Sequence, residues 1–160
     1  MLDLCCGSGC VGLTIAKKTG AEATLADVSE KALAVAKRNA KRLKAKARFV
    51  KSDMFKGISG EFDMIVCNPP YIRTEEIDTL DANVKEHEPR LALDGGADGL
   101  DFYRIIAKEA PRFVKNGGRL YLEVGYDQAE LVAGLLRENF NVHVKKDYDN
   151  VERMILAQKK

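Results

Sequence analysis

Short apolar runs alternate along this chain with segments in which apolar residues recur every three or four positions. Short runs are typical of buried strands, and the second pattern is typical of helices that pack on one face. The predicted strands cover residues 2–4, 22–27, 48–50, 62–66, 119–124, 141–145 and 153–157. One predicted helix begins near residue 11, and three others cover residues 29–43, 101–115 and 127–139. This alternation predicts an α/β fold with a mostly parallel sheet and helices on both faces.

Residues with special backbone chemistry define the predicted ends of several elements. Ser29 is a good N-cap for the helix that follows it. Pro111 predicts a kink in the helix 101–115, and the residues Asn116-Gly117-Gly118 are expected to stop that helix. Asp127 and Glu130 have the spacing of a capping box. The short linker between the last two strands predicts an antiparallel hairpin, so we expect one antiparallel strand at the edge of the sheet.

A glycine-rich turn follows the first predicted strand. The residues Gly7-Ser8-Gly9-Cys10-Val11-Gly12 have the pattern G-x-G-x-x-G and lead into an apolar helix. Glycines let the backbone approach a ligand, and the free amides at the helix start face it. Asp27 ends the next strand twenty residues after Gly7, the spacing at which a carboxylate accepts hydrogen bonds from ribose hydroxyls. Together these features predict a nucleotide-type cofactor, whereas Asp27 alone could be an ordinary acid at a helix start.

A second candidate site closes the apolar run 62–66. Cys67 and the four residues Asn68-Pro69-Pro70-Tyr71 follow this run. The prolines remove two backbone donors and hold the carbonyls of Asn68 and Pro69 in fixed directions. The result is a pocket rich in hydrogen-bond acceptors beside an aromatic ring, where we place the chemistry. The alternative is a plain turn at a strand end.

Composition limits the remaining possibilities. A chain of 160 residues that is 46% hydrophobic and 31% charged can bury an ordinary core, so we expect one domain over residues 1–160. The apolar N-terminus lacks a basic lead-in and breaks at glycines, so neither a signal peptide nor a membrane span is predicted and the cytoplasm is the default location. The four cysteines match neither a zinc spacing nor a disulfide framework. We therefore expect reduced cysteines and no metal.

Charge is distributed unevenly, although the formal net charge is only +2. Residues 37–51 contain eight Lys or Arg and no acid, which favours either a nucleic-acid patch or a solvated helix end. The position of this segment, opposite the expected ligand crevice, favours the solvated helix end. The long connection from Ile72 to Gly99 contains eight acids and three bases, and we expect it to form an acidic lid over the site.

The order of these motifs along the sheet resembles that of the S-adenosylmethionine-dependent methyltransferases. Gly7 and Gly9 follow the first strand, Asp27 the second, Ser52-Asp53 the third and Asn68 to Tyr71 the fourth. The later stretch His87-Glu88-Pro89-Arg90-Leu91-Ala92-Leu93-Asp94-Gly95-Gly96, followed by Asp98-Gly99-Leu100, is similar to the signature of protein-glutamine methyltransferases that modify peptide chain release factors, and of relatives acting on a ribosomal protein. This resemblance covers essentially the whole chain. It implies a Rossmann-like class I methyltransferase sheet.

The resemblance also implies roles for individual residues. Asp3 would face the amino group of S-adenosyl-L-methionine, Asp27 its ribose, and Asp53 with Met54 its adenine. The implied cofactor-binding residues are Asp3, Gly7, Ser8, Gly9, Asp27, Val28, Asp53, Met54 and Asn68. The implied catalytic residues are Asn68, Pro69, Pro70 and Tyr71. The implied substrate-binding residues are Asn68, Pro69, Tyr71, Glu88, Pro89 and Arg90.

A carboxamide nitrogen is a weak nucleophile, because it shares its lone pair with the carbonyl. The resemblance implies that Asn68 and the Pro69 carbonyl hold the substrate amide while Tyr71, or a neighbouring ring, stacks on its plane. We expect an in-line displacement that depends on positioning and electrostatics, without a strong base. The expected partner is a peptide chain release factor.

Other readings remain open at this point. Amino methyltransferases of RNA or DNA use a similar Asn-Pro-Pro-Tyr stretch on a flipped adenine, although the acidic lid disfavours a nucleic-acid partner. A methyltransferase-fold protein without catalysis is a second alternative, because we expect the chain to lack both the helical substrate-docking domain of these relatives and the start of the first strand. A nicotinamide dehydrogenase would have no use for Asn68 to Tyr71. The sequence does not predict an oligomeric state.

Overall fold

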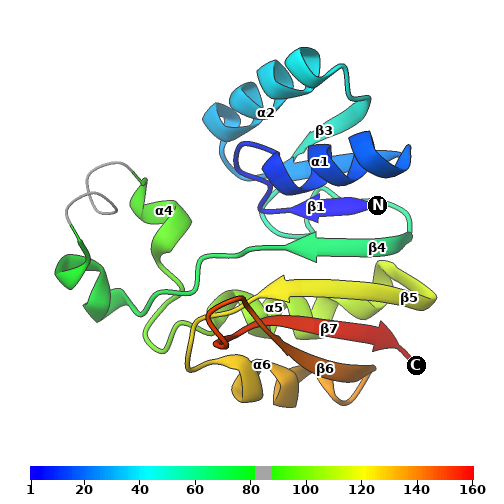
Figure 1. Cartoon of the computed structure of the whole chain (residues 1–160). Coiled ribbons are helices and arrows are strands. Elements are labelled where there is room, and N and C mark those ends of the chain that lie inside the picture. Colours follow the sequence, from blue (N-terminus) through cyan, green and yellow to red (C-terminus); the bar gives the residue numbers. More distant parts are fainter. Residues whose placement is uncertain (82–87) are drawn as a thin grey trace.

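A mixed seven-stranded sheet organises the computed structural model, which describes residues 1–81 and 88–160 (Figure 1). The strands are β1 (Leu2–Leu4), β2 (Ala23–Asp27), β3 (Ala47–Lys51), β4 (Phe62–Cys67), β5 (Val114–Glu123), β6 (Phe140–Lys146) and β7 (Glu152–Lys159). Their order across the sheet is β3-β2-β1-β4-β5-β7-β6. The pairs from β3 to β5 are parallel, and β7 is antiparallel to both of its neighbours. The predicted α/β fold is confirmed.

Helices cover both faces of this sheet. The helical elements are α1 (Cys10–Thr19), α2 (Glu30–Leu43), η1 (Thr74–Thr79), α4 (Arg90–Leu93), α5 (Asp101–Glu109), η2 (Ala110–Arg112) and α6 (Ala129–Leu136). One apolar cluster joins α1 and α2 to β2. A larger cluster joins α5 and α6 to β1, β4, β5 and β7. Each strand residue therefore has a defined face, and on β1 the apolar Leu2 and Leu4 flank the polar Asp3.

The helix expected at residues 101–115 is shorter in the structure. It ends at Glu109, and Pro111 lies in the 3-10 turn η2 rather than at a kink within a helix. The residues Asn116-Gly117-Gly118 do not stop this helix, because they already belong to β5. Fully buried Val114 pairs with Phe62 of β4, so strand pairing recruits residues that the local pattern assigned to the helix.

The capping box expected at Asp127 and Glu130 is wrong as well. Gln128 is the N-cap residue of α6, and no side chain caps this helix. Asp127 instead pairs with Arg73 at 2.6 Å, and Glu130 pairs with Arg137 at 2.8 Å. The helix ends at Leu136, three residues before the predicted end. Ion pairs, one of them between residues 54 positions apart, thus take the acids that local spacing assigned to a cap.

Two other local predictions are confirmed. The Ser29 hydroxyl accepts a hydrogen bond from the backbone N–H of Ala32 at 3.2 Å, as expected for an N-cap. The strands β6 and β7 form the antiparallel hairpin at the sheet edge, with β7 inside and β6 outermost. In the described part of the chain, no helix has the length and apolar character needed to cross a membrane.

The long connection after β4 leaves the edge of the sheet at which the parallel strands end. It contains η1 and α4, which project from that edge (Figure 1). The start and the later part of this connection lie side by side, because Ile72 forms an isolated parallel bridge with Asp94. The predicted lid therefore lies at the same end of the molecule as the candidate site.

Candidate active site

A cavity of about 1050 Å³ opens between α1, with the loop before it, and residues of β4, β5 and β7. Five of the residues proposed from the sequence line it together, namely Asp3, Gly7, Ser8, Asn68 and Tyr71. They come from the ends of β1 and β4 and from the loop between β1 and α1, so the parallel topology brings them to one edge. A cavity of this size holds a ligand as large as a nucleoside.

The loop between β1 and α1 has a backbone that few sequences can adopt. Cys5, Gly7 and Gly9 all have positive φ angles, of 56°, 53° and 75°. A Cβ atom on Gly9 would lie 2.7 Å from the side chain of Leu25, so this position requires glycine for space as well as for conformation. The loop is thereby held tightly against β2. The free amides expected here are largely absent, because the backbone N–H groups of Cys6, Gly7, Gly9 and Gly12 donate within the protein to Ala26, Asp27, Cys6 and Asp3.

Asp3 is a buried carboxylate in the wall of this cavity. It is 4% exposed, and its Oδ2 atom accepts a hydrogen bond from the backbone N–H of Gly12 at 2.8 Å. Burial raises the pKa of Asp3 to about 6, and the nearby Asp27 adds to this rise while the bond from Gly12 opposes it. Within residues 1–81 and 88–160, no Lys or Arg forms an ion pair with Asp3. A buried carboxylate of this kind favours a positively charged ligand beside it.

Asp27 at the end of β2 stabilises the loop between β1 and α1. Its Oδ2 atom accepts a hydrogen bond from the backbone N–H of Gly7 at 2.8 Å, and its Oδ1 atom accepts one from Ser29 at 2.8 Å. Asp27 itself does not line the cavity. Each of its oxygens retains a second lone pair with which it can accept another hydrogen bond.

The residues proposed to meet the adenine lie further along the sheet edge. Val28 is exposed, Asp53 pairs with Lys56 at 2.5 Å, and Met54 is buried with a positive φ of 49°. These three residues, and Gly9, do not line the cavity. These residues therefore lie outside the cavity that Asp3, Gly7 and Ser8 line.

The stretch from Asn68 to Tyr71 forms the opposite wall. Asn68 is exposed, Pro69 and Pro70 are buried outside the cavity lining, and Tyr71 is half-buried. The Tyr71 hydroxyl donates to Glu123 Oε1 at 3.2 Å, and both burial and the Glu123 carboxylate raise the pKa of this phenol. Asn68 and Tyr71 thus line the cavity, while the two prolines between them do not.

Three charged residues that line the cavity were not proposed from the sequence: Glu123, Asp147 and Arg153. Glu123 ends β5, which lies beside β4, so its place at the carboxyl end of a predicted strand could have indicated it. Asp147 and Arg153 lie at the hairpin of β6 and β7, 3.9 Å apart. Only the insertion of β7 beside β5 brings this hairpin to the site, and no local pattern predicts that insertion.

The proposed substrate residues in the lid lie apart from the cavity. Glu88, Pro89 and Arg90 are exposed at the start of α4 and do not line it. Arg90 Nε donates to Asp94 Oδ2 at 3.3 Å. His87, which belongs to the same signature, lies outside the described residues.

All four cysteines line this cavity or its base. Cys5, Cys6, Cys10 and Cys67 are free thiols. Burial raises the pKa of Cys6 and of Cys67 well above that of an exposed thiol, so both stay protonated at neutral pH. In the described part of the chain, no group of three His, Cys, Asp or Glu residues is arranged to hold a metal ion.

Comparison with known proteins gives one family and many relatives. The family model of the methyltransferase small domain matches residues 1–97. A release factor glutamine methyltransferase of Caulobacter vibrioides is 45% identical over 99% of this chain and 57% of its own length. That of Geobacter sulfurreducens is 40% identical over 97% of this chain and 56% of its own length. The chain therefore spans about half the length of the curated relatives that it matches.

Solved structures share the fold at lower identity. A methyltransferase from Pyrococcus furiosus matches 99% of this chain and 73% of its own, with a TM-score of 0.73 and 22% identity. The ribosomal protein L11 methylase of Lactobacillus delbrueckii matches 99% and 69%, with a TM-score of 0.71 and 17% identity. At these identities the likeness concerns the class I methyltransferase fold alone.

Proposed function

The chain belongs to the methyltransferase small domain family, and from this premise we propose that it transfers a methyl group from S-adenosyl-L-methionine to a protein glutamine. The acceptor is the side-chain amide nitrogen, and the protein that carries it is a peptide chain release factor. Relatives named for this activity match 97–99% of the chain, which supports the choice of acceptor. The observation that carries the proposal is the placement of Asn68 and Tyr71 on the same cavity as the buried Asp3.

The residues of the cavity fit S-adenosyl-L-methionine. This cofactor carries an amino group and a positively charged sulfur, and Asp3 is a buried carboxylate without a cation partner among the described residues. In our proposal Asp3 faces the amino group, while the backbone of Gly7, Ser8 and Gly9 lies along the methionine part. When bound, the cofactor supplies a methyl group that is electrophilic because it is attached to a positively charged sulfur.

The adenosine part would extend along the edge toward β2 and β3. Asp27 would accept hydrogen bonds from the ribose hydroxyls with its remaining lone pairs, since its present donors are two backbone amides. Val28, Asp53 and Met54 would border the adenine. These contacts lie beyond the cavity lining, so substitution of these residues should weaken cofactor binding without changing the acceptor.

The acceptor amide needs orientation more than deprotonation. In our proposal the side-chain oxygen of Asn68 and the carbonyl of Pro69 accept hydrogen bonds from the two N–H groups of the acceptor amide and fix its plane, with the amide nitrogen toward the cofactor. The ring of Tyr71 packs on that plane, held by its bond to Glu123. Positioning and electrostatics then lower the barrier, and the nitrogen loses its proton to water once it has become acidic through methylation.

The lid supports a protein acceptor over a nucleic acid. Residues 72–99 carry eight acids and three bases, which disfavours contact with phosphates. Of the three bases, Arg73 pairs with Glu76 and Asp127, and Arg90 pairs with Asp94. Exposed Glu88, Pro89 and Arg90 would meet the release factor at the outer side of the lid. A cytoplasmic location follows from this proposal, because release factors act in translation.

Transfer of labelled methyl groups tests the proposal. The protein is incubated with labelled S-adenosyl-L-methionine and, separately, a release factor with unmodified glutamine, a ribosomal protein and total RNA. We expect label in the release factor alone. Label in RNA alone would support the adenine amino methyltransferase instead, and calorimetry without detectable cofactor binding would support a protein that has the fold but no catalysis.

A further inference from the structure

Gln128 joins three segments that meet behind the acceptor wall of the cavity. Its side chain is buried, with 2% exposure, although glutamine is a polar residue. Its Nε2 atom donates to the carbonyl of Tyr71 at 2.9 Å and lies 3.4 Å from the carbonyl of Gly99. Its Oε1 atom accepts a hydrogen bond from the backbone N–H of Gly125 at 3.0 Å. One side chain thus connects the motif after β4, the end of the lid and the turn after β5.

Two glycines of the lid signature pack directly on the backbone that Gln128 holds. A Cβ atom on Gly95 would lie 2.7 Å from Cα of Tyr71. A Cβ atom on Gly99 would lie within 2.5 Å of both the Tyr71 carbonyl and Nε2 of Gln128, and Gly99 also has a positive φ of 74°. Neither position has room for a side chain. The lid signature therefore encloses the Tyr71 backbone, and Gln128 makes the polar contact within that enclosure.

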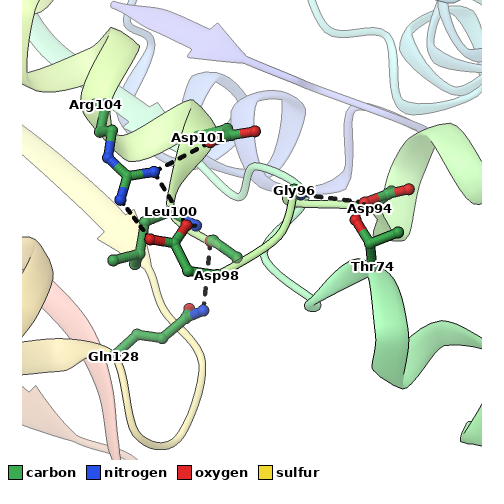
Figure 2. A network of polar contacts seen from close by, with 9 residues as sticks. Thr74, Asp94, Gly96, Asp98, Leu100, Asp101, Arg104 and Gln128 are labelled. Atoms are coloured by element: carbon green, nitrogen blue, oxygen red, sulfur yellow. Dashed lines mark hydrogen bonds and ion pairs between the residues drawn. The ribbon is translucent and has the colours of Figure 1, made fainter.

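Acidic side chains of the same signature hold its loop in shape. Figure 2 shows Asp94 accepting hydrogen bonds from the Thr74 hydroxyl at 2.7 Å and from the N–H of Gly96 at 3.1 Å. In the same view, Asp98 accepts from the N–H of Leu100 at 3.1 Å and pairs with Arg104. The Gly99 carbonyl that faces Gln128 lies between these two points. The loop is thus fixed on both sides of its contact with Gln128.

The residue before Gln128 anchors the lid from the same side. Asp127 pairs with Arg73, two residues after Tyr71, at 2.6 Å. The start of α6 therefore holds both the backbone of Tyr71 and the first charged side chain of the lid. Glu123, which accepts a hydrogen bond from the Tyr71 hydroxyl, is the last residue of β5 and so lies just before residues 125–128. The ring and the carbonyl of Tyr71 are both fixed by residues between 123 and 128.

We propose that Gln128 is a positioning residue for methyl transfer, because it fixes the backbone of Tyr71 and thereby the ring that packs on the acceptor amide. It does not touch the reacting atoms, since it is buried behind the wall and does not line the cavity. The expected effect of Gln128 on turnover rests on the proposed function. Its effect on the position of Tyr71 does not depend on any substrate.

Two substitutions separate positioning from folding. Gln128→Leu removes the donor and leaves the Tyr71 carbonyl unpaired, and we expect kcat to fall by about 10- to 100-fold while the cofactor Kd changes by less than about two-fold. In Gln128→Glu, the introduced carboxyl accepts from Gly125 as before but can donate to the Tyr71 carbonyl only when it is protonated. Burial should raise the pKa of this carboxyl. Its turnover relative to the parent protein should therefore recover as the pH falls from 8 to 6, whereas that of Gln128→Leu should not.

Gln158→Leu is the matched control. Gln158 is exposed on β7, and its Nε2 atom donates to the carbonyl of Gly117 at 3.3 Å, outside the cavity lining. The same change there should leave kcat unaltered. All assays are run below the melting temperature of each variant, so that loss of folded protein does not enter the comparison.

A second readout reports on Tyr71 without a substrate. The protein is labelled with ¹³C in its tyrosine rings, and the Tyr71 resonance is identified from the variant Tyr71→Phe. We expect Gln128→Leu to shift or broaden this resonance and Gln158→Leu to leave it in place. An unchanged Tyr71 resonance, or a Gln128→Glu variant whose relative turnover does not depend on pH, would overturn the inference. A moved resonance in a protein that methylates no release factor would uphold the positioning by Gln128 and refute the proposed function.

Discussion

Replacing Asp3 with asparagine should make the protein more stable and weaken its hold on the cofactor. The carboxylate is buried against Gly12, and its pKa of about 6 lies well above the ordinary value of 3.8. Each pH unit between these values corresponds to about 1.4 kcal/mol, so the charged form costs the folded protein about 3 kcal/mol at neutral pH. Asparagine keeps an oxygen that accepts from Gly12 and carries no charge.

The sign of the pH dependence follows from the direction of this change. Between pH 3.8 and 6 the folded protein binds more protons at Asp3 than the unfolded chain does, so its stability falls as the pH rises through this window. The advantage of Asp3→Asn should therefore grow from about 1.6 kcal/mol at pH 5 to about 3 kcal/mol at pH 7.5. A gain of this size corresponds to a rise in Tm of roughly 6 to 12 °C for a chain of this length.

Urea unfolding at the two pH values, followed by circular dichroism, measures this difference. Asp53→Asn at an exposed carboxylate serves as the control and should change stability by no more than about 0.5 kcal/mol. Calorimetry with S-adenosyl-L-methionine should show a loss of affinity for Asp3→Asn. An Asp3→Asn variant that is less stable than the parent, or equally stabilised at both pH values, would refute the account of Asp3 as a buried carboxylate whose charge destabilises the folded protein.

Three further substitutions test other parts of the structure. Asn68→Ala should lower kcat at least about 100-fold and change the cofactor Kd by only a few-fold, because the residue acts on the acceptor. Gly9→Ala should cost roughly 2–4 kcal/mol in urea unfolding, since φ is 75° and the new methyl group meets buried side chains, whereas Gly20→Ala, with φ of 74° and no atom within 4 Å, should cost only about 1 kcal/mol. Tyr103→Phe should cost about 1 kcal/mol, because the buried hydroxyl donates to the carbonyl of Glu123 at 2.8 Å.

The parts of the site that follow strand ends could be predicted from the sequence. Asp3 lies in the first short strand and Asn68 directly follows the fourth, and a parallel sheet brings the carboxyl ends of such strands to one edge. The glycine pattern from Gly7 likewise fixes a loop whose special φ angles few other residues adopt. These features depend on local chemistry and on one topological rule. The order of the motifs along the chain was therefore enough to predict that Asp3, Gly7, Ser8, Asn68 and Tyr71 lie at one edge of the sheet, where they line the same cavity.

The parts that depend on long-range contacts could not be predicted. Val114 joins β5 because β4 offers Phe62 as a partner, although its own neighbourhood has a helical pattern. Asp127 has the spacing of a capping residue, but Arg73 reaches it from 54 positions away. Gln128 gives no sequence signal, because its role arises only when the backbones of Tyr71 and Gly99 meet it. In each case tertiary contacts outweigh the local preference.

The most direct test of the proposed activity is the identity of the methylated atom. A release factor carrying unmodified glutamine is incubated with the protein and S-adenosyl-L-methionine, digested, and analysed by tandem mass spectrometry. We predict one added methyl group on the side-chain amide of a single glutamine, and none when the protein carries Asn68→Ala. A methyl group on another kind of side chain, or equal methylation by the Asn68→Ala variant, would contradict the proposed transfer to an amide held by Asn68.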